Sequence, residues 1–258
     1  PQACSARMAG EAQGRMDFFD RQWRSYRAIV DHDLMEHRAV AASTAAAVEP
    51  WLAARPAGAP APTWLDLGCG DLALLAPLLR RLPLGHYTGL DLAEAVLPLA
   101  QRNLGAVAYP TTWCTGDLLA WSQGGGAAAP GEDPAQHQPD LLHSAFAIHH
   151  LDDTQKQQFL EGARRRIAPG GLFIWVDVFR NAAEPRQAYI ERYVRRIHSG
   201  WQALDAEQRE HVETHLRSFD LPAERGHIEA MAEAAGWRWR WAWQGSHQAE
   251  AMAVLTPA

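Results

Sequence analysis

From Thr63 onward, short apolar runs alternate with amphipathic segments, and this alternation restricts the possible folds more than any other feature of the chain. Strand patterns lie at residues 63–67, 86–92, 107–114, 140–147 and 171–179, and helical patterns lie at residues 71–82, 93–104 and 152–167. Strands that alternate with helices favour an α/β fold with a parallel sheet, helices on both faces and right-handed crossovers. A length of 258 residues fits one elaborated domain of this kind.

Helical sequence flanks this alternation on both sides. Residues 17–54 have apolar side chains at helical spacing, and the proline-rich stretch 53–62 that follows predicts a connector. Residues 184–218 are also predicted to be helical, and a last helix is expected at residues 227–235. We therefore expect an N-terminal helical lid over residues 1–54 and a main domain over residues 63–258, with 184–218 as a helical insertion.

The chain closes with two more strand patterns, at residues 237–243 and 250–256. The first carries Trp237, Trp239, Trp241 and Trp243 at every second position. A period of two predicts a strand with all four tryptophans on one buried face, which explains them more simply than a stacking platform for bases. Residues 122–138, rich in glycine, alanine and proline, interrupt the alternation and are expected to form a surface insertion.

Composition narrows the class of partner. The formal net charge is -6, and Lys156 is the only lysine among 24 basic residues, so a nucleic acid partner is disfavoured. The three cysteines have no metal-ligand or disulfide spacing. No apolar run approaches the length of a membrane span, and the first residues lack the apolar core of a signal peptide. We expect a soluble, cytoplasmic protein with a small partner; nothing in the sequence indicates its oligomeric state.

Glycines and acids follow the ends of the first three predicted strands. Asp66, Gly68 and Gly70 lie in the segment LDLGCGD, Asp91 closes the second strand, and Asp117 follows the third. The carboxyl ends of parallel strands form the edge where ligands bind, and glycines there allow a ligand to approach the backbone. An acid at the position of Asp91 can accept hydrogen bonds from two ribose hydroxyls. Asp117 can accept one from an adenine amino group, with Leu118 against the base.

The glycine loop also bears on which adenosine cofactor binds. Dinucleotide loops carry a third glycine and cradle a pyrophosphate, whereas GCGDLALL has two and places Asp71 where the first helix is expected to begin. An acid at that position disfavours a phosphate. S-adenosylmethionine carries a cationic amine and sulfonium instead, so we expect Asp66 to pair with the amine.

Five segments together resemble the successive motifs of class I S-adenosylmethionine-dependent methyltransferases. They are LDLGCGD, YTGLDLAEAVLPLA, GDLLAW, FAIHHLDD and APGGLFIWVDVF, and they cover residues 65–179 in this order. The resemblance implies a Rossmann-like, seven-stranded, mostly parallel sheet with S-adenosylmethionine as cofactor. By the same resemblance, the cofactor-binding residues are Asp66, Gly68, Gly70, Asp91, Leu92, Asp117 and Leu118. The segment after the fifth strand is similar to small-molecule methyltransferases and also to carboxy-S-adenosylmethionine synthase, an enzyme of tRNA modification.

Three residues near the ends of strands four and five are catalytic candidates. His149 and His150 follow the fourth strand, and Asp177 lies at the end of the fifth. A histidine at this edge is suited to act as a general base near neutral pH. The alternative is that these side chains only shape the loop.

Aromatic residues outside the minimal fold are candidates for binding the acceptor. Trp23 and Tyr26 lie on the first helical segment, and Tyr193 and Trp201 lie on residues 184–218, so the acceptor pocket is expected to use both segments. Ordinary packing is an equally good interpretation of each. His211 and His215 have a spacing that would suit a metal, but without a third ligand a solvated helix face is the better interpretation, and no metal is expected.

The expected reaction is transfer of a methyl group from S-adenosylmethionine to an oxygen, nitrogen or carbon atom of a small-molecule acceptor. Three alternatives remain open at this point. They are a carboxy-S-adenosylmethionine synthase, which would need a cation to hold an additional carboxylate, a methyltransferase acting on tRNA or protein, and a binding module without activity. Fold alone does not choose the acceptor.

Overall fold

A computed structural model describes residues 24–125 and 138–258 of the chain. Residues 24–31 are helical. The elements that follow, in chain order, are α2 (His37–Ala53), β1 (Thr63–Leu67), α3 (Ala76–Leu79), β2 (His86–Asp91), η1 (Glu94–Val96), α4 (Leu97–Leu104), β3 (Thr111–Thr115), α5 (Leu118–Ser122), β4 (Leu141–Ala145), η2 (Ile148–His150), α6 (Asp153–Arg166), β5 (Leu172–Arg180), α7 (Arg186–Gly200), α8 (Ala206–Phe219), β6 (Ala223–Glu224), α9 (Arg225–Ala234), β7 (Trp237–Gln244) and β8 (Glu250–Pro257).

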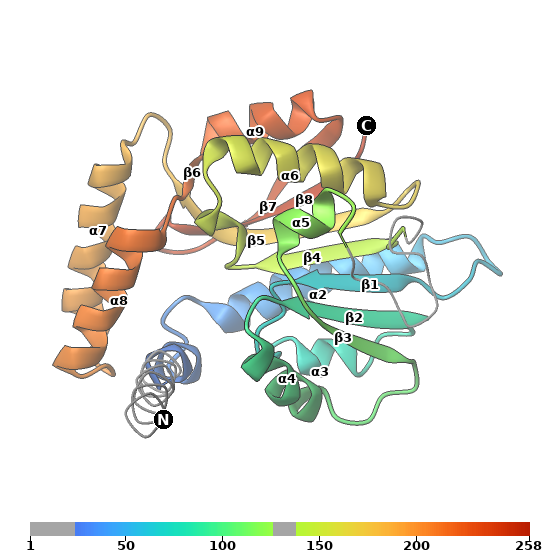
Figure 1. Cartoon of the computed structure of the whole chain (residues 1–258), viewed down its shortest axis with the longest axis horizontal. Helices are drawn as coiled ribbons and strands as arrows, with labels where there is room; N and C mark the ends of the chain where they lie inside the picture. Colours follow the sequence, from blue (N-terminus) through green and yellow to red (C-terminus); the bar gives the residue numbers. More distant parts are fainter. Residues whose placement is uncertain (1–23, 126–137) are drawn as a thin grey trace, which may run out of the picture. The chain divides into compact units, whose positions relative to one another are not determined.

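One sheet organises the fold, with the strand order β3-β2-β1-β4-β5-β8-β7 (Figure 1). Strands β1 to β5 pair in parallel, and β8 pairs antiparallel with both β5 and β7. The short strand β6 adds to β5 outside this path. The order reverses between β1 and β4, where a ligand site is expected at the carboxyl edge of a doubly wound sheet. The Rossmann-like α/β fold with a mostly parallel sheet is therefore confirmed.

Helices cover both faces of the sheet. On one face, α5, α6 and α9 pack together and enclose the main apolar core, which includes Leu65, Phe159, Phe173 and Trp175 (Figure 1). Helix α2 lies on the other face, where the hydroxyl of Thr44 donates a hydrogen bond to the sulfur of Met252 on β8. The strands β1, β4 and β5 are buried along almost their whole length, as expected for strands covered on both sides.

Two predicted helices differ from the structure. The expected helix 71–82 is reduced to the single turn of α3, because Leu72 has a positive φ of 57° and residues 73–75 form turns before Ala76. Asp71 therefore does not begin a helix, which corrects the expectation drawn from its position. The expected helix 17–54 is interrupted at residues 32–36, where Asp33 and Glu36 have positive φ values, and restarts as α2.

The late strands also contain one correction. A β-bulge separates Trp241, which pairs with Ala253, from Trp243, which pairs with Met252. Ala253 and Met252 are consecutive and point to opposite faces, so Trp243 faces the other side of the sheet from Trp241. Trp237, Trp239 and Trp241 lie against the main core as expected, whereas Trp243 does not share their face.

The described residues fall into two compact units. The larger contains Arg38–Arg186 and Leu221–Ala258, apart from residues 126–137, and the smaller contains residues 24–37 and Gln187–Asp220. Helix α2 belongs to the larger unit, where it packs on the sheet. The expected insertion 184–218 forms the two helices α7 and α8. In the described parts of the chain, no helix is long and apolar enough to cross a membrane.

Candidate active site

The loop after β1 brings two glycines to the carboxyl edge of the sheet. Gly68 and Gly70 have positive φ values of 74° and 55°. The backbone N–H groups of Gly68 and Cys69 donate to the carbonyl oxygen of Leu90 at 2.8 and 3.0 Å, so β2 fixes the course of the loop. A Cβ atom added at Gly68 would lie 2.6 Å from the Cβ atom of Ala147. Glycine at this position is therefore required both by the backbone conformation and by the loop that follows β4.

Asp91 at the end of β2 is tied to the same loop. Its Oδ2 atom accepts a hydrogen bond from the N–H of Gly70 at 2.9 Å, and its Oδ1 atom accepts one from the N–H of Ala93 at 2.8 Å. A carboxylate offers about four acceptor positions, more than these two N–H groups use. Burial raises the pKa of Asp91, although the hydrogen bonds from Ala93 and Gly70 oppose the rise. The carboxylate is thus oriented beside the glycine loop with capacity for further donors.

Asp66 lies inside the sheet rather than at its open edge. Only 1% of the residue is exposed, its Oδ1 atom lies 2.8 Å from Nδ1 of His143 on β4, and its Oδ2 atom accepts a hydrogen bond from the hydroxyl of Tyr87 on β2 at 3.1 Å. Burial and the charge of Asp66 raise the pKa of Tyr87 well above its usual value, so the phenol stays a donor. Asp66 therefore links three strands beneath the glycine loop. The contact of Asp66 with a cofactor amine, as expected from the sequence, stays a prediction.

The third strand supplies Asp117 and Leu118 at the start of α5. Asp117 is the N-cap of α5, because its Oδ1 atom accepts a hydrogen bond from the N–H of Ala120 at 2.8 Å. Gly116 donates to the carbonyl oxygen of Asp91 at 2.9 Å, which places the end of β3 beside that of β2. Leu92 is 72% exposed in the same region. The ends of β2 and β3 thus present carboxylates next to an accessible apolar side chain.

His149 and Asp177 form a buried pair across β4 and β5. Nδ1 of His149 lies 2.6 Å from Oδ1 of Asp177, and the backbone N–H of His149 donates to Oδ2 at 3.0 Å. Trp175 and Val178 donate to the same carboxylate at 3.0 and 2.9 Å. Burial favours the neutral acid, but the charge of His149 and these hydrogen bonds outweigh it and hold the pKa of Asp177 below its usual value. An ionised Asp177 requires the proton of His149 to be on Nδ1.

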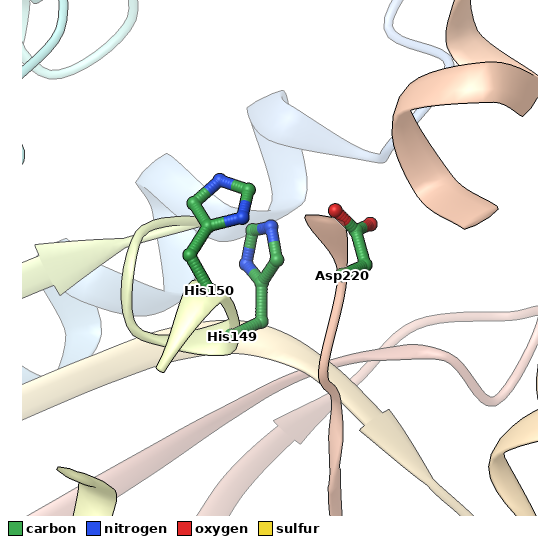
Figure 2. Close-up of side chains that lie close together, drawn as sticks. All are labelled: His149, His150 and Asp220. Atoms are coloured by element: carbon green, nitrogen blue, oxygen red, sulfur yellow. The ribbon is translucent and has the colours of Figure 1, made fainter. Parts of the chain in front are cut away.

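His150 differs from its neighbour in its surroundings. It is exposed, and its ring lies beside that of His149, with ring centroids 4.1 Å apart (Figure 2). The structure therefore brings the three catalytic candidates together, and Asp177 orients the ring of His149. Asp220, also drawn in Figure 2, belongs to the smaller unit.

The smaller unit contains the aromatic residues expected to bind the acceptor. Tyr193 and Trp201 are buried there, with ring centroids 5.9 Å apart, and the guanidinium of Arg196 lies over both rings. They are core residues of that unit. Tyr26 is 38% exposed, and Trp23 lies outside the described residues.

The candidate metal pair of α8 belongs to the same unit. Nε2 of His215 lies 3.6 Å from Oδ1 of Asp220, an ion pair if the imidazole is protonated. His211 lies one turn before it on α8.

Two polar residues near the site were missed by the sequence reasoning. His143 lies on β4 and pairs with Asp66, and Lys156 is completely buried on α6. The sequence around His143 does not indicate its partner, because Asp66 lies 77 positions away in the chain. For Lys156 a signal existed, since it lies three and four positions before Phe159 and Leu160, the spacing that places residues on one face of a helix.

Residues 65–173 match a family of methyltransferase domains. An uncharacterized methyltransferase of Mycobacterium tuberculosis is 32% identical over 107 residues, which cover 42% of this chain and 46% of that protein. A Mycobacterium bovis protein with the same description matches equally well. The match therefore spans less than half the length of these curated relatives.

Solved structures share the fold at low sequence identity. The magnesium protoporphyrin IX methyltransferase of Synechocystis, solved with bound SAH, has a TM-score of 0.58 and 16% identity, with 94% of each chain covered. A SAM-dependent methyltransferase of Leishmania major has a TM-score of 0.53 and 16% identity, covering 84% of this chain and 73% of that one. These likenesses support the fold assignment and carry no information on the acceptor.

Proposed function

We propose that the chain is a class I S-adenosylmethionine-dependent methyltransferase and that it transfers a methyl group from S-adenosylmethionine to a small-molecule acceptor. The observation that carries this proposal is the placement of Gly68, Asp91 and Asp117 at the ends of β1, β2 and β3, at one edge of the sheet. One acid at a strand end is common, but two acids at neighbouring strand ends beside a glycine loop support a nucleoside site.

The residues of this edge fit the cofactor. Asp91 would hold the ribose hydroxyls, Leu92 and Leu118 would contact the adenine, and Asp117 would accept from its amino group. Gly68 and Gly70 would give the methionyl chain access to bare backbone. Asp66, which is bonded to His143 and Tyr87, would pair with the cofactor amine through its remaining acceptor positions.

The residues of the chain that act on the acceptor would be His149 and Asp177. When bound, S-adenosylmethionine supplies an electrophilic methyl group on a sulfonium leaving group. Asp177 holds the imidazole of His149 through Nδ1, so Nε2 is the nitrogen that would take a proton from an acceptor hydroxyl or amine. General base catalysis of this kind contributes about 10²- to 10⁴-fold.

The proposed acceptor is small because the charge of the chain is unfavourable for a polyanion. The net charge is -6, and nucleic acid binding depends on neutralising phosphates with cations. Tyr26 is proposed as an acceptor contact because it is an accessible aromatic residue. Tyr193 and Trp201 would act indirectly, by keeping the smaller unit folded.

Two experiments test the function. Calorimetry should show binding of S-adenosylhomocysteine and none of NAD, and the reverse result would overturn the cofactor assignment. The purified protein is then incubated with methyl-labelled S-adenosylmethionine and separate small-molecule, tRNA and protein fractions of a bacterial extract. Label in the small-molecule fraction alone is the expected result. Label in tRNA, or a retained ligand heavier than S-adenosylmethionine by a carboxylate in native mass spectrometry, would favour the alternatives instead.

A further inference from the structure

We propose that Lys156 is a positioning residue for His149, a buried ammonium that holds the turn after β4 in the orientation the base requires. The inference rests on the proposed function, because it concerns the same site. The turn in question is η2 with Leu151, its C-cap residue. Lys156 lies on α6 and none of the residue is exposed.

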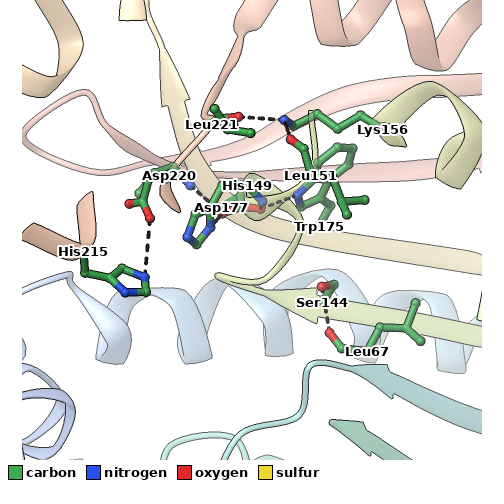
Figure 3. A network of polar contacts seen from close by, with 11 residues as sticks. Leu67, Ser144, His149, Leu151, Lys156, Trp175, Asp177, His215, Asp220 and Leu221 are labelled. Carbon is green, nitrogen blue, oxygen red and sulfur yellow. Dashed lines mark hydrogen bonds and ion pairs between the residues drawn. The ribbon is translucent and has the colours of Figure 1, made fainter. Parts of the chain in front are cut away.

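Lys156 connects two chain segments that meet at the turn (Figure 3). Its Nζ atom donates to the carbonyl oxygen of Leu221 at 2.6 Å and also to that of Leu151. Leu221 in turn donates its backbone N–H to the carbonyl oxygen of His149 at 2.8 Å. The ammonium therefore joins Leu151 to Leu221, and Leu221 holds His149. Asp177 also holds His149, because its carboxylate contacts both Nδ1 of the imidazole and the backbone N–H of His149.

An ammonium is suited to this task because it carries three donors and no acceptor. Hydrogen bonds from a charged donor are shorter and stronger than those from a neutral one. A buried charge without such partners would be costly, so a lysine in this position needs a compensating role. Its partners are two backbone carbonyls, those of Leu151 and Leu221. Replacement by an apolar side chain would remove both hydrogen bonds and would release one side of the turn.

The charges around Lys156 are consistent with a constrained ammonium. Burial lowers the pKa of Lys156 to about 8, and Asp153, Asp177 and Asp152 oppose the decrease, whereas Arg180 adds to it. Asp153 on α6 is nearest among these, with its Oδ1 atom 4.0 Å from Nζ. At neutral pH the ammonium is still charged, so both hydrogen bonds to the turn keep their full strength.

The test follows the Nδ1–H proton of His149 by NMR of protein labelled with ¹⁵N-histidine, with the signal identified by its loss in His149→Gln. Lys156→Met keeps the straight side chain and removes the charge and the donors. We expect solvent exchange of this proton to become at least about tenfold faster in Lys156→Met, and to return toward the wild-type rate in Lys156→Arg, which keeps donors and charge. Phe159→Leu, a core change on the same helix, is the stability control.

The outcomes separate positioning from general destabilisation. Wild-type exchange in Lys156→Met, or an equal acceleration in a Phe159→Leu protein of comparable unfolding free energy, would overturn the proposal. If Lys156→Met does not fold, Lys156→Gln, which keeps N–H donors without a charge, is measured in its place, and an unchanged rate there counts against the proposal.

Calorimetry with S-adenosylhomocysteine on the same samples tests the proposed function independently. Wild-type protein that does not bind it would contradict the function and leave the NMR result on Lys156 valid. Lys156→Met should bind it within about twofold of the wild-type affinity, because Asp91 and Asp117 come from other strands.

Discussion

Nδ1 of His149 lies 2.6 Å from Oδ1 of Asp177, across the adjacent strands β4 and β5. The carboxylate accepts four hydrogen bonds, two from His149 and one each from Trp175 and Val178, and it is buried. A carboxylate held in this way stays ionised and keeps the imidazole in one tautomer. The pair therefore has the arrangement of a general base with its orienting acid.

His149→Gln should lower turnover on the labelled small-molecule acceptor by about 10²- to 10⁴-fold, the usual range for a general base. S-adenosylhomocysteine affinity should change little, because the nucleoside contacts come from β1 to β3. Asp177→Asn should reduce turnover in the same direction, since an amide cannot fix the tautomer of the ring. His150→Ala is the matched control, because it changes the exposed histidine next to His149. If His150→Ala lowered turnover as much as His149→Gln, the role of base would move to His150.

Asp91→Ala should weaken S-adenosylhomocysteine binding by about 1.5 to 3 kcal/mol, the range for hydrogen bonds to a charged group. The variant also loses the two hydrogen bonds that Asp91 accepts from Gly70 and Ala93, so the glycine loop becomes less well held. Calorimetry measures the change, and Glu94→Ala, which removes an exposed acid nearby, should bind as the wild type does. Unchanged affinity in Asp91→Ala would show that this acid only supports the loop.

Gly68→Ala should abolish cofactor binding and lower the melting temperature. The new Cβ atom would lie 2.6 Å from that of Ala147, and the residue would keep a φ of 74°, which costs about 1 to 2 kcal/mol for a residue with a side chain. Gly58→Ala separates the two effects, because Gly58 has a φ of 81° with open space around it. Gly58→Ala should therefore lose some stability and keep full S-adenosylhomocysteine affinity; equal affinity losses in the two variants would contradict the role of the clash.

The free energy of unfolding should increase as the pH rises above about 8, because of Lys156. Burial lowers its pKa from 10.5 to about 8 in the folded chain, so between these values the unfolded chain binds a proton that the folded chain does not. Stability then increases with pH, by at most about 1.4 kcal/mol per pH unit. Urea unfolding of wild type and Lys156→Met at pH 7, 8, 9 and 10 measures this as the difference between the two proteins. A difference that is constant with pH would contradict the shifted pKa.

Much of the fold was predictable because it depends on local pattern. The helix expected at residues 152–167 is present as α6, which begins at a capping box of Asp152 and Gln155, and the parallel strands β1 to β5 fall close to the expected ranges. The helix expected at residues 71–82 was too long, since the left-handed conformation of Leu72 depends on the loop around it and not on its own preference. The bulge after Trp241 depends on how β7 aligns with β8, which a period of two does not encode.

For the site, the sequence predicted which residues come to one edge but not what they bond to. Strand order alone brings His149 and Asp177 together, so both could be named as candidates. The engagement of Asp66 by His143 and Tyr87 was not predictable, because it depends on which side chains of three neighbouring strands point into the same layer. The same is true of Lys156, whose partners are backbone carbonyls that have no signature in the sequence.

The bulge in β7 also bears on aggregation. Among the described strands, β7 lies at one end of the sheet and pairs only with β8, so its other side presents backbone groups that another chain could pair with. A bulge twists such a strand away from a flat template, and the exposed Arg238 and Arg240 place charge beside it. A tryptophan-rich strand can thus occupy the border of the sheet without recruiting a second copy into a growing β-structure.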